Sequence, residues 1–195
     1  DRFYTAFFPG EAVVCGQRLT SFSTFHYLTL SAIGSPFLCG DGVIRPSDLM
    51  AAVRICQLDY GNSPRISPTI RDLLRIRRMN RNEELFHREC AAFSVFMSAH
   101  CSGPRFWNQV EGGQKFRELT GPEALIPVTS AMLKLGLPEA DAWNMSMGRL
   151  QWYNAQTSEI EGSERRFLDQ SEIEETDRIL TALEQKQAKE GVNHA

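Results

Sequence analysis

The chain has 195 residues, of which 42% are hydrophobic, and its 21 Lys and Arg against 24 Asp and Glu give a formal net charge of −3. This apolar content suffices for one buried core and excludes disorder along the whole chain, because disordered chains are poorer in such residues. An acidic chain exerts no general pull on nucleic acid or anionic lipid, and no apolar run reaches the roughly 20 residues that span a bilayer. We therefore expect a soluble globular protein.

The first 20 residues form the least helical part of the sequence. Residues 12–14 and 18–19 flank the turn-forming Cys15-Gly16-Gln17, a pattern that predicts a short β-hairpin. Because two strands alone are marginally stable, we expect this hairpin to pack on helices. Apolar residues at helical spacing then predict a helix over about residues 21–33, which Gly34 ends.

Two more helices are predicted in the next part of the chain. Ser47 is the expected N-cap of the first, and its apolar face consists of Leu49, Ala52, Val53 and Cys56. Ser67-Pro68 is expected to start the second, because proline suits the first helical position. The apolar residues of this second helix are Ile70, Leu73 and Leu74.

Asn82 begins a longer helix, since Glu83 and Glu84 place negative charge at its positive end. Its apolar side chains recur at intervals of three and four residues, at Phe86, Cys90, Phe93 and Met97. We expect this to be the central helix, ending before Gly103-Pro104. Residues 105–119 are predicted to form a loop.

The C-terminal part is predicted to hold three shorter helices and an acidic tail. Thr120 and Glu123 have capping-box spacing ahead of a helix to about residue 135, in which Pro127 delays the start or causes a kink. Residues 137–143 predict a short helix, and Ser146 is the expected cap of another that ends at Gly162. A thin apolar stripe runs through an acidic helix over residues 172–188, at Ile173, Leu180 and Leu183.

These elements predict a mainly α fold, a compact multi-helix domain with a short N-terminal β-hairpin and a C-terminal acidic helix. We assign residues 1–162 to a helical core domain, with the hairpin in about residues 1–20. Residues 163–195 are assigned to the acidic C-terminal helix and tail.

The reactive side chains do not form a recognisable site. Glu84 and His87 have the Glu-x-x-His spacing of di-iron helix bundles, but such sites need this pattern twice and two further glutamates. His87 with Cys90, and His100 with Cys101, lack the other ligands of a zinc site and a group that would orient a nucleophile. The common phosphate-binding and nucleophile-elbow motifs do not occur. We predict no catalytic residue, no metal and no cofactor.

The cysteines are scattered along the chain without a Cys-x-x-Cys pair. Their number is odd, and a disulfide scaffold is not expected in a chain with this much core. We expect them to act as small buried apolar side chains in a reducing compartment. They are Cys15, Cys39, Cys56, Cys90 and Cys101.

Arginines are concentrated between residues 65 and 88. Arg71, Arg75 and Arg78 share one helical face at i, i+4 and i+7. This face could bind phosphate groups. It could equally be a solvated face that pairs with the acidic C-terminal region of the same chain or of a neighbouring subunit, or a surface for an acidic partner protein. The pairing with the C-terminal region is favoured, and the other two interpretations remain open.

Tryptophan and methionine residues gather in the C-terminal half. Core packing is the favoured role of the tryptophans, although tryptophan is also frequent in interface hot spots. Methionines beside a tryptophan can adapt to several partner segments. The candidate partner-binding residues are Arg71, Arg75, Arg78, Trp143, Met145, Met147 and Trp152.

Two stretches of the sequence resemble small proteins from the tail-morphogenesis regions of long-tailed phages and prophages. One stretch is RLTSFSTFHYLTL at residues 18–30, followed by IGSPF at residues 33–37. The other is PEADAWNMSMGRLQWY at residues 138–153, followed by a Glu-x-x-Gly turn at residues 159–162. Ser146 stands where proline is usual in these proteins. The chain is thus similar, in pieces, to the tail assembly chaperones.

The resemblance implies a non-enzymatic helical chaperone in the cytoplasm of an infected bacterial host. Its expected partners are the tape-measure protein, which such chaperones coat, and the tail-tube subunits, which they help to recruit. We also expect a homo-oligomer and no membrane contact. One alternative is a structural tail or connector protein retained in the virion. Another is a nucleic-acid-binding adaptor that uses the arginine-rich region of residues 65–88.

Overall fold

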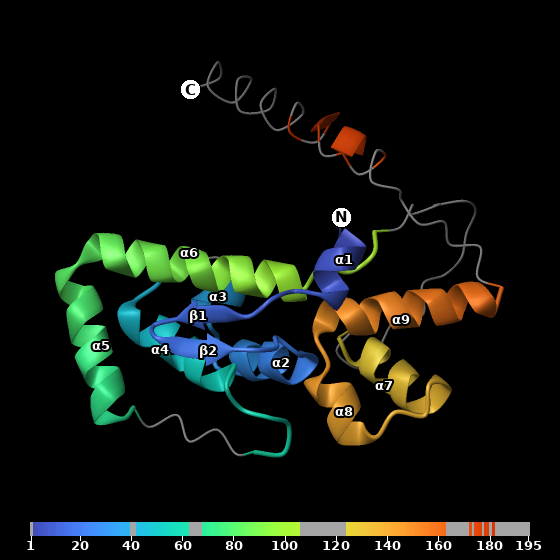
Figure 1. Ribbon diagram of the computed structural model, residues 1–195, viewed down its shortest axis with the longest axis horizontal. Coiled ribbons are helices and arrows are strands. Elements are labelled where there is room, and N and C mark those ends of the chain that lie inside the picture. Colours follow the sequence, from blue (N-terminus) through green and yellow to red (C-terminus); the bar gives the residue numbers. More distant parts are fainter. Residues whose placement is uncertain are drawn as a thin grey trace.

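The computed structural model describes residues 2–39, 42–62, 68–105 and 124–162, with residues 172, 174–176, 178, 179 and 181, but not the side chain of Cys39. Of the residues that the structure describes, 67% are helical, and a two-stranded antiparallel hairpin lies near the N-terminus (Figure 1). The predicted mainly α fold is therefore confirmed. Within the described residues, no helix is long and apolar enough to cross a membrane.

The predicted hairpin is present as β1 (Ala12–Val14) and β2 (Gln17–Leu19), with Val14 opposite Gln17. The two turn residues both have positive φ, 51° at Cys15 and 66° at Gly16. This pair of left-handed residues characterises the type I′ turn, whose twist matches that of the strands. The inward side chains of Val14 and Leu19 are buried on the helices, as expected for a hairpin that cannot stand alone.

A helix that the sequence did not predict, α1 (Arg2–Phe7), precedes the hairpin. Its aromatic side chains explain the difference, because Phe3 lies edge-on to Trp152 and Phe7 lies edge-on to Tyr153. Such aromatic contacts supply tertiary packing that local propensity does not reveal.

The next three helices are α2 (Thr24–Ala32), α3 (Pro36–Cys39) and α4 (Pro46–Ile55). Helix α2 confirms the prediction and ends before Gly34, whose φ is 64°. Helix α4 corrects the predicted cap, because it begins before Ser47 and Arg45 occupies the N-cap position. The backbone N–H of Arg45 donates to Asp48 at 2.9 Å, and Pro46 fits the first helical turn.

Helix α5 (Ile70–Arg81) also begins later than predicted. Thr69 is its N-cap, and Thr69 and Asp72 form a capping box: the Asp72 N–H donates to Thr69 Oγ1 at 3.3 Å and the Thr69 N–H donates to Asp72 Oδ2 at 2.9 Å. The predicted cap Ser67 lies outside the described residues, and Pro68 precedes the helix instead of starting it.

The predicted central helix is α6 (Glu83–His100), and it confirms the periodicity of its sequence. Asn82 caps it by accepting the Leu85 N–H at 2.9 Å. Phe93 and Phe96 are buried in the core of the protein. The predicted loop begins at its far end, but residues 106–123, including the predicted cap Thr120, lie outside the described residues.

The C-terminal part contains α7 (Leu125–Lys134), α8 (Glu139–Asn144) and α9 (Met147–Ile160). Pro127 is the third residue of α7, where a missing N–H costs no helical hydrogen bond. Ser146 occupies the N-cap of α9 without a side-chain cap bond. Beyond α9, the described residues between 172 and 181 are all helical, in agreement with the expected helix there. The predicted division after residue 162 stays a prediction.

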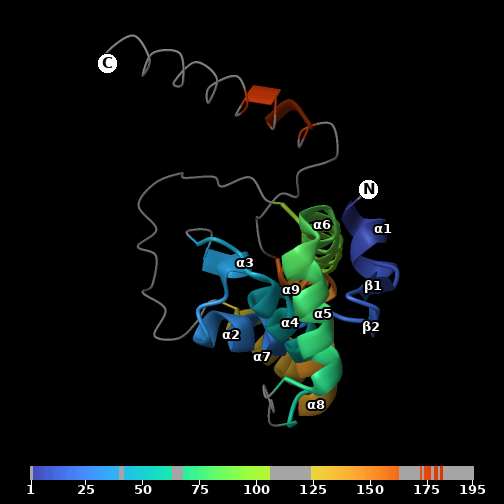
Figure 2. The ribbon, with the colours of Figure 1, turned by 90° about the vertical axis from the view of Figure 1, so that its left-hand side faces the viewer.

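The buried apolar side chains form two clusters, and the elements that carry them follow one another along the long axis (Figure 1). The larger cluster joins the hairpin with α2, α4, α5 and α6, and the smaller joins α7, α8 and α9. Asn144 connects them, because its backbone carbonyl accepts from Ser21 Oγ at 3.0 Å and its side chain accepts from the Tyr60 N–H at 2.7 Å. Helix α5 therefore lies at the end of the molecule opposite to the carboxyl end of α9 (Figures 1 and 2).

Candidate protein-docking surface

The outer side of α5 is unusual because it is both apolar and basic. Its three aliphatic residues are exposed, Ile70 by 78%, Leu73 by 52% and Leu74 by 62%. The three apolar residues that the sequence places on this helix therefore face solvent. We define the α5 face as these three residues together with the exposed arginines of the same helix, Arg71, Arg77, Arg78 and Arg81.

The inward side of α5 is built around a buried carboxylate. Asp72 is 1% exposed, and its oxygens accept from Thr69 Oγ1 at 2.7 Å and Gln17 Nε2 at 3.4 Å. Arg54 of α4 and Arg75 of α5 lie 3.7 and 3.6 Å from it. A buried charge needs such a complete set of partners. Because all of them lie on the inner side, Asp72 fixes the rotation of α5 and turns the aliphatic residues outward.

These partners also determine the ionisation of Asp72. Burial on its own would raise the pKa of this carboxyl group. The hydrogen bonds from Thr69 and the charges of Arg54 and Arg75 outweigh that effect and hold the pKa of Asp72 below its ordinary value. The group is therefore an anion at neutral pH and acts as a structural anchor between α4, α5 and the hairpin.

The three candidate arginines of α5 do not act together. Arg75 is half-buried, pairs with Asp72 and donates to the Gly16 carbonyl at 3.4 Å. Arg71 and Arg78 are exposed. Arg75 therefore belongs to the scaffold that holds the hairpin turn, and Arg71 and Arg78 belong to the outer surface.

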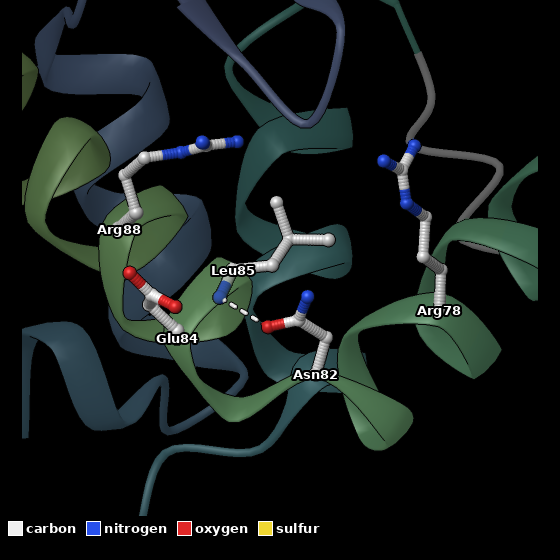
Figure 3. A pocket seen from close by; sticks show the side chains of 5 residues that line it. All are labelled: Arg78, Asn82, Glu84, Leu85 and Arg88. Atoms are coloured by element: carbon white, nitrogen blue, oxygen red, sulfur yellow. Dashed lines mark hydrogen bonds between the residues drawn. The ribbon is translucent and has the colours of Figure 1, made fainter.

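A hollow at the junction of α5 and α6 continues this surface. Its lining consists of Arg78, Asn82, Glu84, Leu85 and Arg88. Figure 3 shows the side chain of Leu85 between the guanidinium groups of Arg78 and Arg88. An apolar floor flanked by two cations suits a partner side that offers aliphatic and acidic groups.

The hairpin turn is tied to the same two helices. The Cys15 N–H donates to Glu89 of α6, and the Cys15 Sγ lies 3.8 Å from Met79 Sδ of α5. Burial, followed by the charge of Glu89, raises the pKa of the Cys15 thiol to about 12. This thiol is not activated as a nucleophile, because only the thiolate reacts.

The other described cysteines behave similarly. Cys56 is buried, and Cys90 and Cys101 are half-buried, which agrees with their expected apolar role. Burial raises the pKa of Cys90 and of Cys101 to about 11 in each case. The side chain of Cys39 lies outside the described part of the chain.

The candidate partner-binding residues of the C-terminal half lie in contacts within the chain. Trp143 stacks on Tyr60, with ring centroids 4.9 Å apart, and Trp152 donates to the Ser102 carbonyl at 3.0 Å. Met145 packs on the smaller apolar cluster and Met147 on the larger one. Trp143, Met147 and Trp152 thus contact the other half of the fold, whereas Met145 packs within its own half. The partner-binding role of all four residues stays a prediction.

The Glu-x-x-His pair on α6 does not converge with further ligands. His87 lies 3.4 Å from Glu83, one turn away, and both side chains are largely exposed. Across residues 2–39, 42–62, 68–105 and 124–162, no three His, Cys, Asp or Glu side chains form a group that could hold a metal ion. That the protein is not an enzyme and binds no cofactor stays a prediction.

Sequence reasoning missed the carboxylate that defines this surface, although a signal was present. The sequence Thr69-Ile70-Arg71-Asp72 has capping-box spacing, which places Asp72 beside Thr69 in the first turn. Asp72 is also the single acid in a helix with five arginines. The sequence did not show that Asp72 is buried, because two of its partners, Arg54 and Gln17, come from α4 and the hairpin.

Comparisons of the chain with protein-family models, with curated proteins and with solved structures find no match.

Proposed function

We propose that this protein is a tail assembly chaperone of a long-tailed phage or prophage, which binds the tape-measure protein in the host cytoplasm and helps to recruit tail-tube subunits. The sequence resemblance suggests this role, and one structural observation supports it. A long helix, α5, displays three aliphatic side chains to solvent among four exposed arginines.

The chemistry of the α5 face suits an amphipathic helix with acidic flanks. Exposed aliphatic residues that gather on one helix mark an interaction site more often than scattered ones do. Helical partners are recognised through anchors at i, i+3, i+4 and i+7, and Ile70, Leu73, Leu74 and Arg77 have this spacing. The arginines would add charge complementarity, which favours association rate and register.

A nucleic acid suits the same face less well. Arginines alone are sufficient to bind phosphate groups. In a complex with nucleic acid, the exposed Ile70, Leu73 and Leu74 at the centre of this surface would remain in contact with water. A folded protein helix covers both kinds of side chain. We therefore favour a protein partner, with nucleic acid as an outcome that the experiment below can reveal.

The proposal is tested by co-expression with the tape-measure protein of the same tail gene cluster. We expect the wild-type chain to keep the tape-measure protein soluble and to co-purify with it. The double variant Leu73→Ser/Leu74→Ser should lose most of this activity while its thermal unfolding stays close to wild type. The matched control is Val95→Ser, which removes an aliphatic side chain that is 69% exposed on α6.

Three results would reject the proposal. The tape-measure protein could precipitate whether or not the wild-type chain is present. Stoichiometric retention of the chain in purified virions would indicate a structural tail or connector protein instead. Tight binding of the purified chain to DNA, steeply weakened by salt and unaffected by the serine substitutions, would indicate a nucleic-acid adaptor.

A further inference from the structure

The C-terminal segment of the chain is the chemical complement of the α5 face. Residues 169–184 contain a single arginine, Arg178, and a thin apolar stripe at Ile173, Leu180 and Leu183. Where the structure describes this segment it is helical, and Ile179 is 53% exposed. Its acidic residues are Asp169, Glu172, Glu174, Glu175, Asp177 and Glu184.

We propose that the acidic segment of one copy of this chain docks on the α5 face of a second copy. This inference rests on the proposed role of α5 as a docking face for an acidic helix. The segment offers aliphatic residues to Ile70, Leu73 and Leu74, and it offers carboxylates to the surrounding arginines. Each copy thereby covers the α5 face of the other, which is otherwise exposed. The helix that covers it is acidic and amphipathic, like the client helix proposed above.

The length of the chain indicates a second copy instead of the same one. The amino end of α6 adjoins α5, and its carboxyl end meets the first turns of α9, where Trp152 donates to the Ser102 carbonyl. Helix α6 has 18 residues and is therefore about 27 Å long, and α9 continues for roughly 12 Å beyond Trp152 in the direction away from α5 (Figure 1). The path to α5 is thus about 40 Å or more.

The connection available within one chain is shorter. Nine residues, 163–171, separate the end of the core from Glu172. Even fully extended, the ten Cα-to-Cα intervals from Gly162 to Glu172 span about 33–36 Å. Glu172, where the described helix of the segment begins, therefore does not reach the α5 face of its own chain, which favours a neighbouring copy as the partner. A neighbouring copy has no such restriction.

Reciprocal exchange gives a closed dimer. Each copy has one acidic segment and one α5 face, and two copies can satisfy both contacts at once. Closed two-fold assemblies of this kind are the commonest homo-oligomers. In such a dimer the α5 face is occupied until a client helix displaces the segment, which would keep an unloaded chaperone from aggregating.

The test uses the full chain and reversal of charge on each side of the contact. One variant carries Arg71→Glu and Arg78→Glu, and the other carries Glu172→Lys and Glu175→Lys. Light scattering of the purified wild-type chain should give twice the chain mass of 22.0 kDa at tens of micromolar protein and low salt. Each variant alone should give the mass of one chain, a two-fold decrease.

Mixing the two variants provides the decisive measurement. In the mixture the new lysines of one variant can pair with the new glutamates of the other, and the unchanged α5 face of one variant matches the unchanged acidic segment of the other, so the mixture should return to twice the chain mass. The control variant Arg18→Glu/Arg149→Glu changes the same number of charges away from α5 and should remain dimeric. Circular dichroism establishes that each variant is folded.

The outcomes separate this inference from the proposed function. A wild-type chain that is monomeric at all these concentrations, reversal variants that associate like wild type, or a mixture that stays monomeric would each overturn the exchange. If such a chain still keeps the tape-measure protein soluble, the proposed function stands without it. A dimer that dissociates on charge reversal but binds no client would support the exchange and reject the chaperone role.

Discussion

Helices α5 and α6 are neighbours in sequence and space, yet they use their apolar residues in opposite ways. Both carry apolar residues at helical spacing, and Asn82 alone separates them. In α6 the apolar residues Phe93 and Phe96 face the core. In α5 the aliphatic residues Ile70, Leu73 and Leu74 face solvent, and a carboxylate faces inward. Hydrophobic spacing therefore locates a helix but does not determine which side is buried.

The difference arises from the partners available to polar groups. Asp72 has hydrogen-bond donors from Thr69 and Gln17 and two nearby guanidinium groups, so its burial is compensated. If α5 were rotated to bury Leu73 and Leu74, Asp72 and its hydrogen-bond partners would be exposed. Arg54 of α4 would then lose its carboxylate partner. A functional surface can thus be created by a satisfied polar group on the opposite side of the same helix.

The largest effect is expected for a truncation on the core side of α6. Phe93 is 0% exposed and lies 4.8 Å from the ring of Phe37 and 6.1 Å from that of Phe96. Phe93→Ala should lower the free energy of unfolding by about 3–5 kcal/mol, because it removes buried apolar area and leaves a cavity. Urea denaturation followed by circular dichroism measures the change. A loss below about 1 kcal/mol would contradict the assignment of α6 as the central helix.

A smaller but still large effect is expected for the buried carboxylate of α5. Asp72→Ala removes the capping box and leaves Arg54 and Arg75 without a counter-charge, which should cost about 2–4 kcal/mol at pH 7. Asp141→Ala is the control, because Asp141 is an exposed acid in the first turn of α8. An equal effect of the two substitutions in urea denaturation would show that Asp72 is not the anchor of α5.

The same variant makes a prediction about pH. The folded pKa of Asp72 is lowered, so its ionised form stabilises the protein above the unfolded value of about 3.9, and this contribution is lost as the pH falls through the folded pKa. The difference in unfolding free energy between wild type and Asp72→Ala should therefore narrow below about pH 4. A difference that stays constant down to pH 2.5 would contradict the pairing.

Much of the fold follows from local sequence. The hairpin turn at Cys15-Gly16, the periodicity of α6 and the glycine after α2 each specify their structure within a few residues, so the sequence was sufficient for them. The position of Thr69 and Asp72 would also have given the start of α5. Helix α1 was not predictable in this way, because its support comes from Trp152 and Tyr153, nearly 150 residues away in the chain.

The candidate surface was predicted only in part. Arg71 and Arg78 were correctly placed on one side of a helix, but Arg75 turns inward to Asp72 and the Gly16 carbonyl. The spacing identified the aliphatic residues of the helix but did not establish which side of it they occupy. The outward orientation of these residues follows only once Arg54 and Gln17, which belong to other elements, are known to lie against Asp72.

A fourth prediction contrasts the buried carboxylate of α5 with a buried histidine of α6. His100, at the end of α6, is 1% exposed, and neither of its ring nitrogens has a hydrogen-bond partner within the described residues. Burial, and then the neighbouring His26, lowers the pKa of His100 to about 4. Because the unfolded chain binds this proton more readily, folding stability should decrease as the pH falls from about 6.5 towards 4.

Replacing the His100 side chain should remove its contribution to the loss of folding stability at acidic pH. His100→Leu should lose about 2–3 kcal/mol less stability than wild type between pH 7 and pH 4.5, measured by urea denaturation at both pH values. The remaining loss includes His26, whose pKa is also lowered by burial. His87→Gln is the control, since this side chain is 70% exposed. Parallel stability curves for wild type and His100→Leu would refute the assignment.

The smallest effect on stability is expected on the outer side of α5, where it discriminates best between scaffold and docking surface. Leu74 is 62% exposed, so Leu74→Gln removes little buried area and keeps good helix propensity. The free energy of unfolding should change by less than about 0.5 kcal/mol, measured at a protein concentration low enough to keep the chain monomeric. At higher concentration the same variant should self-associate more weakly than wild type. A loss of 2 kcal/mol in the monomer would instead place Leu74 in the core, and the outward orientation of α5, on which both proposals depend, would then be wrong.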